Sequence, residues 1–118
     1  MVLVDTSVWV AHLRDGTIGL EALLNEGHVL CHSFVVGELA CGNLGNRSEI
    51  LSLLHALPMA MHLEHEEAIQ FLENYSLMGK GLGYIDVHLL ASAILTKAHL
   101  WTLDKKLSEV SSKLGLAY

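Results

Sequence analysis

Acidic residues stand at four places along the chain where an apolar run ends or a helix begins. Asp5 and Asp104 each follow an apolar run that reads as a buried strand. Glu38 lies in the first turns of a predicted helix, and Asp86 is the first residue of another. Because ligands of open α/β sheets bind at the carboxyl ends of the strands, we expect all four carboxylates to converge at that edge.

Carboxylates gathered in this way repel one another unless a cation lies among them. Hard ions such as Mg²⁺ and Mn²⁺ prefer oxygen ligands and keep water molecules available for chemistry. Such an ion can lower the pKa of water, orient it and neutralise the charge of a phosphodiester. Hydrolysis there requires neither a catalytic histidine nor a nucleophilic serine. The acidic residues therefore predict a Mg²⁺ or Mn²⁺ site.

The elements that must position these acids alternate between strand-like and helical segments. Five apolar segments read as strands, the third of them weak: 1–4, 28–31, 59–61, 99–102 and 116–117. Helical spacing or helix-start signals mark the others: 7–12, 18–26, 34–42, 46–57, 64–78, 86–98 and 105–114. Ser33 is the expected N-cap of the third helix. This alternation is typical of a parallel sheet covered by helices on both faces, a three-layer α/β/α fold.

The composition describes one small domain of 118 residues, 52% of them hydrophobic. No apolar run reaches the roughly 18 residues of a membrane span, and the opening residues do not form a signal peptide, so we expect a cytoplasmic protein. Cys31 and Cys41 lack metal-binding spacing and read as buried free thiols. The surplus apolar character predicts an oligomer or partner surface. We place it on the helices that carry Leu20, Leu23, Leu24, Ile50 and Leu54.

The net charge of −6 argues at first against a nucleic-acid partner, since phosphate binding depends on Lys and Arg. However, four of the 13 acidic residues belong to the predicted metal site. A bound divalent ion inverts the local potential there. The charge balance is therefore compatible with a nucleic-acid substrate.

Four short motifs occur in an order and at spacings that resemble the PIN-domain ribonucleases, and most closely the VapC-type toxins of prokaryotic toxin–antitoxin systems. The first is Val-Asp-Thr-Ser-Val-Trp at 4–9, and the second is Val-Gly-Glu-Leu at 36–39. The third is Gly-Tyr-Ile-Asp-Val-His-Leu-Leu-Ala-Ser at 83–92, and the fourth is Thr-Leu-Asp at 102–104. The resemblance covers the whole chain, which would then be a single PIN domain at 1–118.

The resemblance implies a five-stranded parallel sheet between helices and a Mg²⁺- or Mn²⁺-dependent endoribonuclease. It also implies a homodimer and a cognate antitoxin whose basic C-terminal segment inserts near the carboxylates. The family's acidic quartet matches these residues: Asp5, Glu38, Asp86 and Asp104. The family's small hydroxyl residues match Thr6 or Ser7 and Thr102. One departure is that Lys105 and Lys106 follow the last acid, where many relatives carry another acidic residue.

We assign direct metal ligation to Asp5 and Asp86. Glu38 and Asp104 would bind the ion directly or through water, and one of them would steer the attacking water. The hydroxyls of Thr6, Ser7 and Thr102 would orient these carboxylates by hydrogen bonds. Contacts to RNA are predicted for one aromatic ring and three cations: Tyr84, Lys80, Lys105 and Lys106. For Tyr84 a role at the edge of the core is an equal alternative, and for the lysines the default interpretation is a solvated surface.

Other enzyme classes fit less well. A receiver domain needs an acid pair after the first strand, and Thr6 follows Asp5; a dehalogenase-like phosphatase needs Asp-x-Asp, and residue 7 is Ser. The segment 62–65 is one residue short of a zinc motif, the eight histidines otherwise show no ligand spacing, and 79–83 reads as a flexible turn. Two alternatives remain open: a PIN-like binding scaffold without catalysis, and a nuclease that acts on another nucleic acid.

Overall fold

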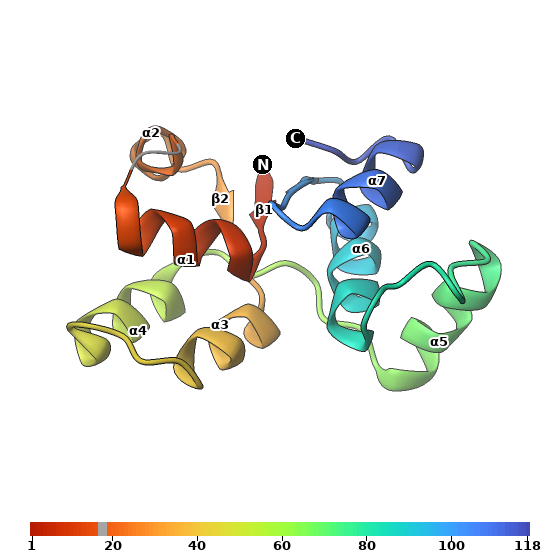
Figure 1. Cartoon of the computed structure of the whole chain (residues 1–118), viewed down its shortest axis with the longest axis horizontal. Coiled ribbons are helices and arrows are strands. Elements are labelled where there is room, and N and C mark those ends of the chain that lie inside the picture. The colour runs from red at the N-terminus through yellow and green to blue at the C-terminus, as the bar shows by residue number, and fades with distance from the viewer. Residues whose placement is uncertain (17–18) are drawn as a thin grey trace.

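A computed structural model describes residues 1–16 and 19–118 (Figure 1). Its sheet has three parallel strands in the order β2-β1-β3: β1 (Val2–Val4), β2 (Val29–Leu30) and β3 (His99–Trp101). Val2 pairs with Val29 on one side and with His99 on the other. The central strand β1 is buried throughout, as expected for an apolar strand that is covered on both faces.

The expectation of five strands was wrong for the described residues. The segments 59–61 and 116–117, which were predicted as strands, each join the sheet through a single bridge only. These bridges pair Cys31 with Met59 and Leu100 with Ala117. Beside β2 the chain leaves the sheet after the pairing of Met59 with Cys31, because the Met61 N–H donates a hydrogen bond to the Thr96 hydroxyl at 3.0 Å instead of to a neighbouring strand. Each of the five predicted segments therefore contributes backbone pairing, but only three of them form strands.

Seven helices surround this sheet in the described part of the chain: α1 (Thr6–Asp15), α2 (Leu20–Asn25), α3 (Ser33–Ala40), α4 (Arg47–Ala56), α5 (His65–Asn74), α6 (Tyr84–Thr96) and α7 (Lys105–Lys113). Helices α1 to α4 lie on one side of the strands and α5 to α7 on the other (Figure 1). We call these the first and second helix groups. Within them, α3 packs mainly against α1 and α4, whereas α6 packs mainly against α5 and β3.

Several helix boundaries differ from the sequence prediction: α1 extends to Asp15 instead of ending near His12, and α6 begins at Tyr84 instead of Asp86. Two further differences have a clear local cause. Helix α3 begins at Ser33, and its N-cap is His32, whose Nδ1 accepts a hydrogen bond from the Phe34 N–H at 3.0 Å. Helix α5 ends at Asn74 and not near residue 78, because Ser76 has a left-handed φ of 52°, which an α-helix cannot accommodate. The helix begins at His65, one residue later than predicted, and Glu64 is its N-cap, with the Glu64 N–H bonded to the Glu67 carboxylate.

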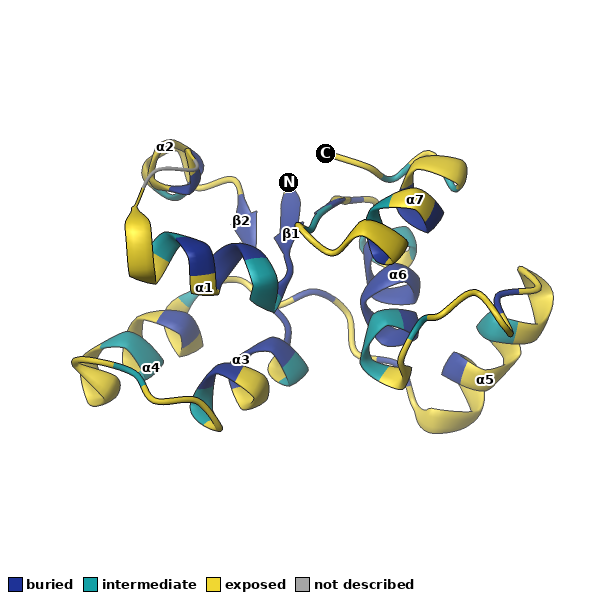
Figure 2. Ribbon diagram, viewed as in Figure 1, coloured by how far each residue is buried: buried dark blue, intermediate teal, exposed yellow. Residues whose placement is uncertain are grey.

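The core lies between the sheet and the inner faces of the helices (Figure 2). Helix α6 is buried from Val87 to Ala93, because it is covered by the sheet on one side and by α5 on another. Cys31 is buried as predicted, but Cys41 is exposed, since it lies beyond the last turn of α3. No helix in the described ranges is long and apolar enough to cross a membrane.

The predicted apolar surface is also corrected. Leu20, Leu23 and Leu54 are in the core, because they point inward from α2 and α4. The apolar side chains exposed on the first helix group are instead Val10, Leu13 and Leu53.

Candidate active site

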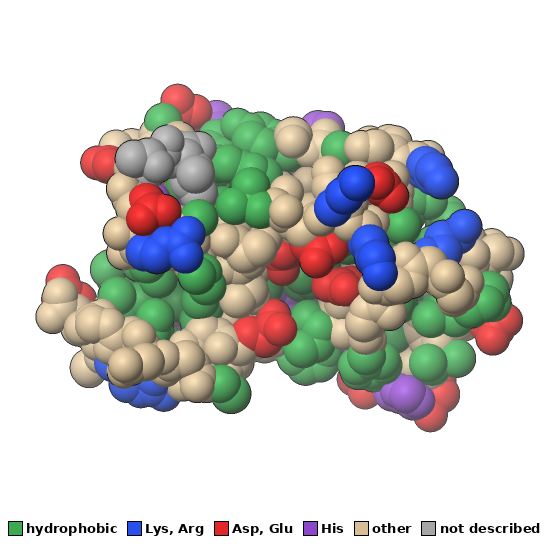
Figure 3. Space-filling view, in the orientation of Figure 1, with side chains coloured by type: hydrophobic (Ala, Val, Ile, Leu, Met, Phe, Trp, Pro, Cys, Tyr) green, Lys and Arg blue, Asp and Glu red, His purple; other side chains and the backbone are tan. Residues whose placement is uncertain are grey.

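Acidic side chains gather near the centre of one face, where the two helix groups meet (Figure 3). The charges of Asp5, Asp104 and Glu38 all act on the carboxyl group of Asp86. The four predicted acids are thus brought to one place, two from each helix group. The convergence expected from the parallel sheet is present, because β1 and β3 are neighbours and both end at this edge.

Asp5 is the most enclosed of the four, with 7% of its surface exposed. It follows β1 directly, and its backbone N–H donates to the Trp101 carbonyl of β3 at 2.9 Å. Its Oδ2 accepts hydrogen bonds from the Ser7 hydroxyl at 2.8 Å and from the Thr102 hydroxyl at 2.7 Å. The orientation of this carboxylate is therefore determined from both neighbouring strand ends.

The same two hydroxyls organise the turn that carries Asp104. The Leu103 N–H donates to Ser7 Oγ, and the Asp104 N–H donates to Thr102 Oγ1, both at 3.0 Å. Asp104 is also the N-cap of α7, because its Oδ1 accepts from the Leu107 N–H at 2.9 Å. The ends of β1 and β3 consequently form one hydrogen-bonded unit.

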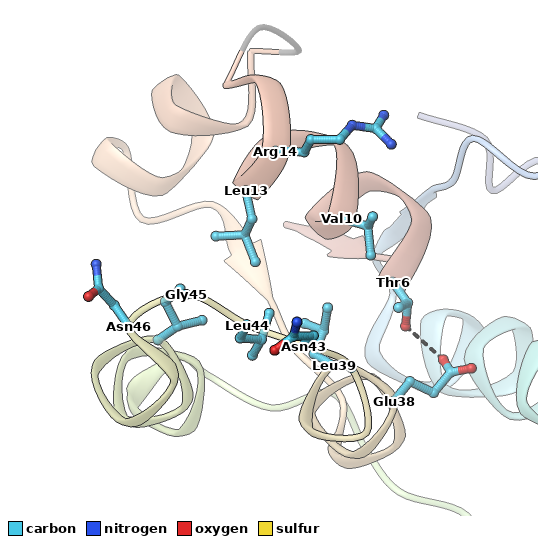
Figure 4. A pocket seen from close by; sticks show the side chains of 12 residues that line it. Thr6, Val10, Leu13, Arg14, Glu38, Leu39, Asn43, Leu44, Gly45 and Asn46 are labelled. Atoms are coloured by element: carbon cyan, nitrogen blue, oxygen red, sulfur yellow. Dashed lines mark hydrogen bonds between the residues drawn. The ribbon is translucent and has the colours of Figure 1, made fainter.

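Glu38 is exposed on α3, and Thr6 holds its carboxylate from α1. The Thr6 hydroxyl donates to Glu38 Oε1 at 2.7 Å (Figure 4). The sequence left open whether Thr6 or Ser7 supports the first aspartate. In the structure Ser7 binds Asp5, whereas Thr6 binds Glu38.

Asp86 lies in the first turn of α6, two residues later than the helix start at Tyr84. Its Oδ2 accepts a hydrogen bond from the Gly83 N–H at 2.9 Å, so this carboxylate caps the helix from inside the first turn. Partial burial raises the pKa of Asp86, and the charges of the other three acids raise it further, while the Gly83 hydrogen bond opposes them. The positive end of the helix dipole also favours a carboxylate there.

The donor chemistry of this group suits a hard cation. The hydrogen bonds described above use one oxygen of each carboxylate, so each acid has a second oxygen to offer. Oxygen donors of this kind are those that Mg²⁺ and Mn²⁺ prefer. Nevertheless, no three His, Cys, Asp or Glu side chains of the described residues stand close enough to hold a metal ion as they are oriented here. Ligation would therefore require these side chains to turn toward a common centre.

A cluster of rings beside the acids escaped the sequence analysis. The rings of His32, His62 and His88 lie 5.4 to 6.4 Å apart and surround Phe34 between α3 and α6. Burial, and next the charges of the other two imidazoles, lower the pKa of His32 to about 4. No spacing rule links positions 32, 62 and 88, so only tertiary contacts reveal this cluster.

The predicted RNA-contacting residues border the acids from the second helix group. Tyr84 is 46% exposed, and its hydroxyl is 2.8 Å from Nδ1 of His65. Basic side chains lie near the acidic patch over α7 (Figure 3), and the basic residues of this helix are lysines. Lys106 packs over Gly81, where a Cβ would come within 2.6 Å of its side chain and where φ is +78°. Gly81 thus permits the close approach of Lys106, which the prediction of a flexible turn did not include.

A pocket of about 660 Å³ opens beside Glu38 between α1, α3 and the 42–46 loop (Figure 4). Thr6 and Glu38 form its polar end. Apolar side chains line much of the rest (Val10, Leu13, Leu39, Leu44 and Ile50), but Arg14, Asn43 and Asn46 also contribute to the wall. The acidic site therefore continues into an apolar groove on the first helix group.

Comparison with known proteins agrees with this geometry. The family model of the PIN domain matches residues 2–113. The chain is 40% identical over 118 residues to Ribonuclease VapC32 of Mycobacterium tuberculosis, in strains CDC 1551 / Oshkosh and ATCC 25618 / H37Rv. The match covers 99% of this chain and 95% of that protein. The chain therefore belongs to the PIN-domain family and is a homologue of VapC ribonuclease.

Proposed function

We propose that this protein is a Mg²⁺- or Mn²⁺-dependent endoribonuclease and the toxin of a toxin–antitoxin pair. The observation that carries the proposal is the meeting of four carboxylates at the carboxyl edge of the sheet, each accepting a hydrogen bond that orients it. The relative named above is itself called a ribonuclease. A PIN-like protein that served only as a binding scaffold would be expected to lack one of these acids. All four are present here, which favours the nuclease.

The four acids differ in exposure, and we assign them different roles accordingly. Asp5 is buried and Asp86 half-buried, so we assign them as ligands of the ion. When bound, Mg²⁺ would lower the pKa of the attacking water and offset the charge that develops on the phosphate. Glu38 and Asp104 are exposed, so one of them would accept a hydrogen bond from that water and orient it toward phosphorus.

Residues around the site supply the remaining tasks. Ser7 and Thr102 hold Asp5, and Thr6 holds Glu38, which limits how far each carboxylate can turn. The exposed ring of Tyr84 would stack on a base of the RNA. Cations beyond the acids would contact its phosphates: Lys80, Lys105 and Lys106.

We place the binding surfaces for the antitoxin and for a second copy of the chain on the first helix group. The largely apolar pocket beside Glu38, which Arg14 also lines, would take a small antitoxin segment, and a basic residue of that segment would pair with the carboxylates. Exposed Val10, Leu13 and Leu53 would be covered by the antitoxin or by a second copy of the chain in a homodimer. We expect both complexes in the cytoplasm.

The proposal is tested with single-stranded and hairpin RNA, and with DNA of the same sequences. We expect cleavage of RNA with Mg²⁺ or Mn²⁺ and none in EDTA, and neither Zn²⁺ nor Ca²⁺ should restore full activity. Undiminished cleavage in excess EDTA would contradict the metal-dependent mechanism. Cleavage of DNA alone would favour the second nuclease alternative, and the absence of any cleavage would favour the scaffold.

A further inference from the structure

The imidazole of His32 joins the two helices that carry Glu38 and Asp86. It is 1% exposed, and both of its nitrogens are hydrogen-bonded. Nδ1 accepts from the Phe34 N–H at the start of α3, and Nε2 is 3.1 Å from the Ser92 hydroxyl of α6. Since Nδ1 accepts a hydrogen bond from the Phe34 N–H, the neutral ring must carry its proton on Nε2, and this Nε2–H donates a hydrogen bond to the Ser92 hydroxyl.

This link spans two helices that pack mainly in different groups and that also meet where the ring of Phe34 on α3 contacts the ring of His88 on α6. Helix α3 rests on α1 and α4, and α6 rests on α5 and β3. In residues 1–16 and 19–118, the bond to Ser92 is the only side-chain hydrogen bond between α6 and either α3 or its cap. Ser92 is fully buried, so its hydroxyl cannot readily bind bulk water in place of His32. Loss of the His32 bond would therefore leave a buried polar group unsatisfied, which costs free energy.

The position of the link relates it to the acids. Glu38 comes six residues after His32, and Asp86 comes six residues before Ser92. Six residues of α-helix span about 9 Å, so each acid lies at a similar distance from the link along its own helix. Glu38 and Asp86 are close enough for their charges to interact, so the two acids lie on the same side of this link.

We propose that His32 is a positioning residue, which ties α3 to α6 and thereby sets the separation of Glu38 from Asp86 in the metal-binding site. This proposal rests on the proposed function. Neither His32 nor Ser92 touches the ion or the RNA; they act through the two helices. The first helix group is in this way coupled to the second at a point where the sheet itself supplies no connection between α3 and α6.

The substitutions separate the two bonds of His32. Asn places an acceptor near the position of Nδ1 and is a good N-cap, so His32→Asn retains the cap and removes the bond to α6. Ser92→Ala removes the same bond from the other side. Ser111→Ala is the matched control, because Ser111 is also a fully buried helical serine, but its hydroxyl bonds only within α7.

The first measurement is binding of Mn²⁺ to the full-length protein without RNA, by titration calorimetry. We expect His32→Asn and Ser92→Ala each to weaken binding by about 10-fold, the lower end for residues that orient metal ligands. The double variant should be little worse than either single variant, because both remove one interaction. Cleavage of RNA should fall mainly in kcat with KM nearly unchanged, and Ser111→Ala should match the wild type.

The second measurement does not depend on metal. The ¹⁵N shifts of the His32 ring should report the Nε2–H form in the wild type and should change in Ser92→Ala. A proton on Nδ1 would overturn the proposal, and so would wild-type Mn²⁺ affinity in folded Ser92→Ala. An equal loss of affinity in Ser111→Ala would also overturn it, since the effect would then be general. If the wild type neither binds Mn²⁺ nor cleaves RNA, the proposed function fails together with the positioning role.

Discussion

The two halves of the acidic site are built differently. Asp5 and Asp104 lie at the ends of neighbouring strands, where Ser7 and Thr102 connect both acids to the backbone through four hydrogen bonds at 2.7 to 3.0 Å. Glu38 and Asp86 lie on helices of different groups, and each accepts one hydrogen bond from its own side. The strand half is rigid through the sheet, whereas the helix half depends on how α3 and α6 are held together.

This difference indicates where the site is robust and where it is adjustable. Parallel pairing of β1 with β3 leaves Asp5 little freedom of position, because a shift would break the ladder. Glu38 and Asp86 can move with their helices. If the site binds an ion as proposed, we expect the helix half to move toward the strand half.

The largest effect is expected from removing a charge in either half. Asp5→Asn and Asp86→Asn should each lower RNA cleavage by about 1000-fold or more, because the electrostatic stabilisation of the reaction is lost. Single-turnover cleavage measures this. Asp15→Asn is the control, since Asp15 is an exposed aspartate that pairs with Arg14. Activity above a tenth of the wild type in either variant would remove that residue from the site.

Metal binding should stabilise the wild type and not these variants. Mg²⁺ at about 100 times its dissociation constant should add about 2.7 kcal/mol to the free energy of unfolding, because a ligand of the native state shifts the equilibrium by mass action. Thermal scans with and without Mg²⁺ compare the wild type with Asp5→Asn and Asp86→Asn. Equal shifts in all three proteins would mean that these acids do not hold the ion.

The supporting hydroxyls should sharpen the comparison between halves. Thr102→Val removes a donor to buried Asp5 and an acceptor of the Asp104 N–H. We expect it to weaken Mn²⁺ binding by about 10- to 100-fold. Thr6→Val removes one hydrogen bond of exposed Glu38 and should cost less. Calorimetric titration compares the Mn²⁺ affinities of the two variants. A larger loss of affinity in Thr6→Val than in Thr102→Val would contradict the idea that the site depends more on the hydrogen bonds of the strand half.

The smallest effect concerns pH in the absence of metal. Since the pKa of Asp86 is raised by burial and by the other acids, the folded state favours its protonated form. That contribution to stability is present below the unfolded pKa, near 3.8, and is lost as pH rises through the folded pKa. Asn carries no charge at any pH, so Asp86→Asn should not lose stability as the pH rises. At pH 7 we expect its free energy of unfolding to exceed that of the metal-free wild type by about 1 kcal/mol. Urea unfolding at pH 4 and pH 7 measures the difference, which should shrink at the lower pH.

Much of the fold follows from local pattern. Apolar runs mark β1, β2 and β3, and helical spacing with capping residues marks the helices that follow them. Because the side chain that ends a parallel strand lies at a known edge, Asp5 and Asp104 could be placed there before any contact was seen. The motifs also predicted that hydroxyls of Thr6, Ser7 and Thr102 would orient carboxylates, but only the structure shows that Ser7 and Thr102 are the two that bind Asp5.

The sequence by itself determined the element order, the parallel class of the sheet and the acids with their neighbouring hydroxyls, because these depend on contacts within a few residues or on a general rule of sheet geometry. Only the tertiary structure decided which hydroxyl supports Glu38, how far the sheet extends at Met59 and Ala117, and that His32 meets Ser92. Each of these depends on two segments that lie far apart in the chain. Their meeting depends on how helices from different groups pack, and no local periodicity encodes that packing.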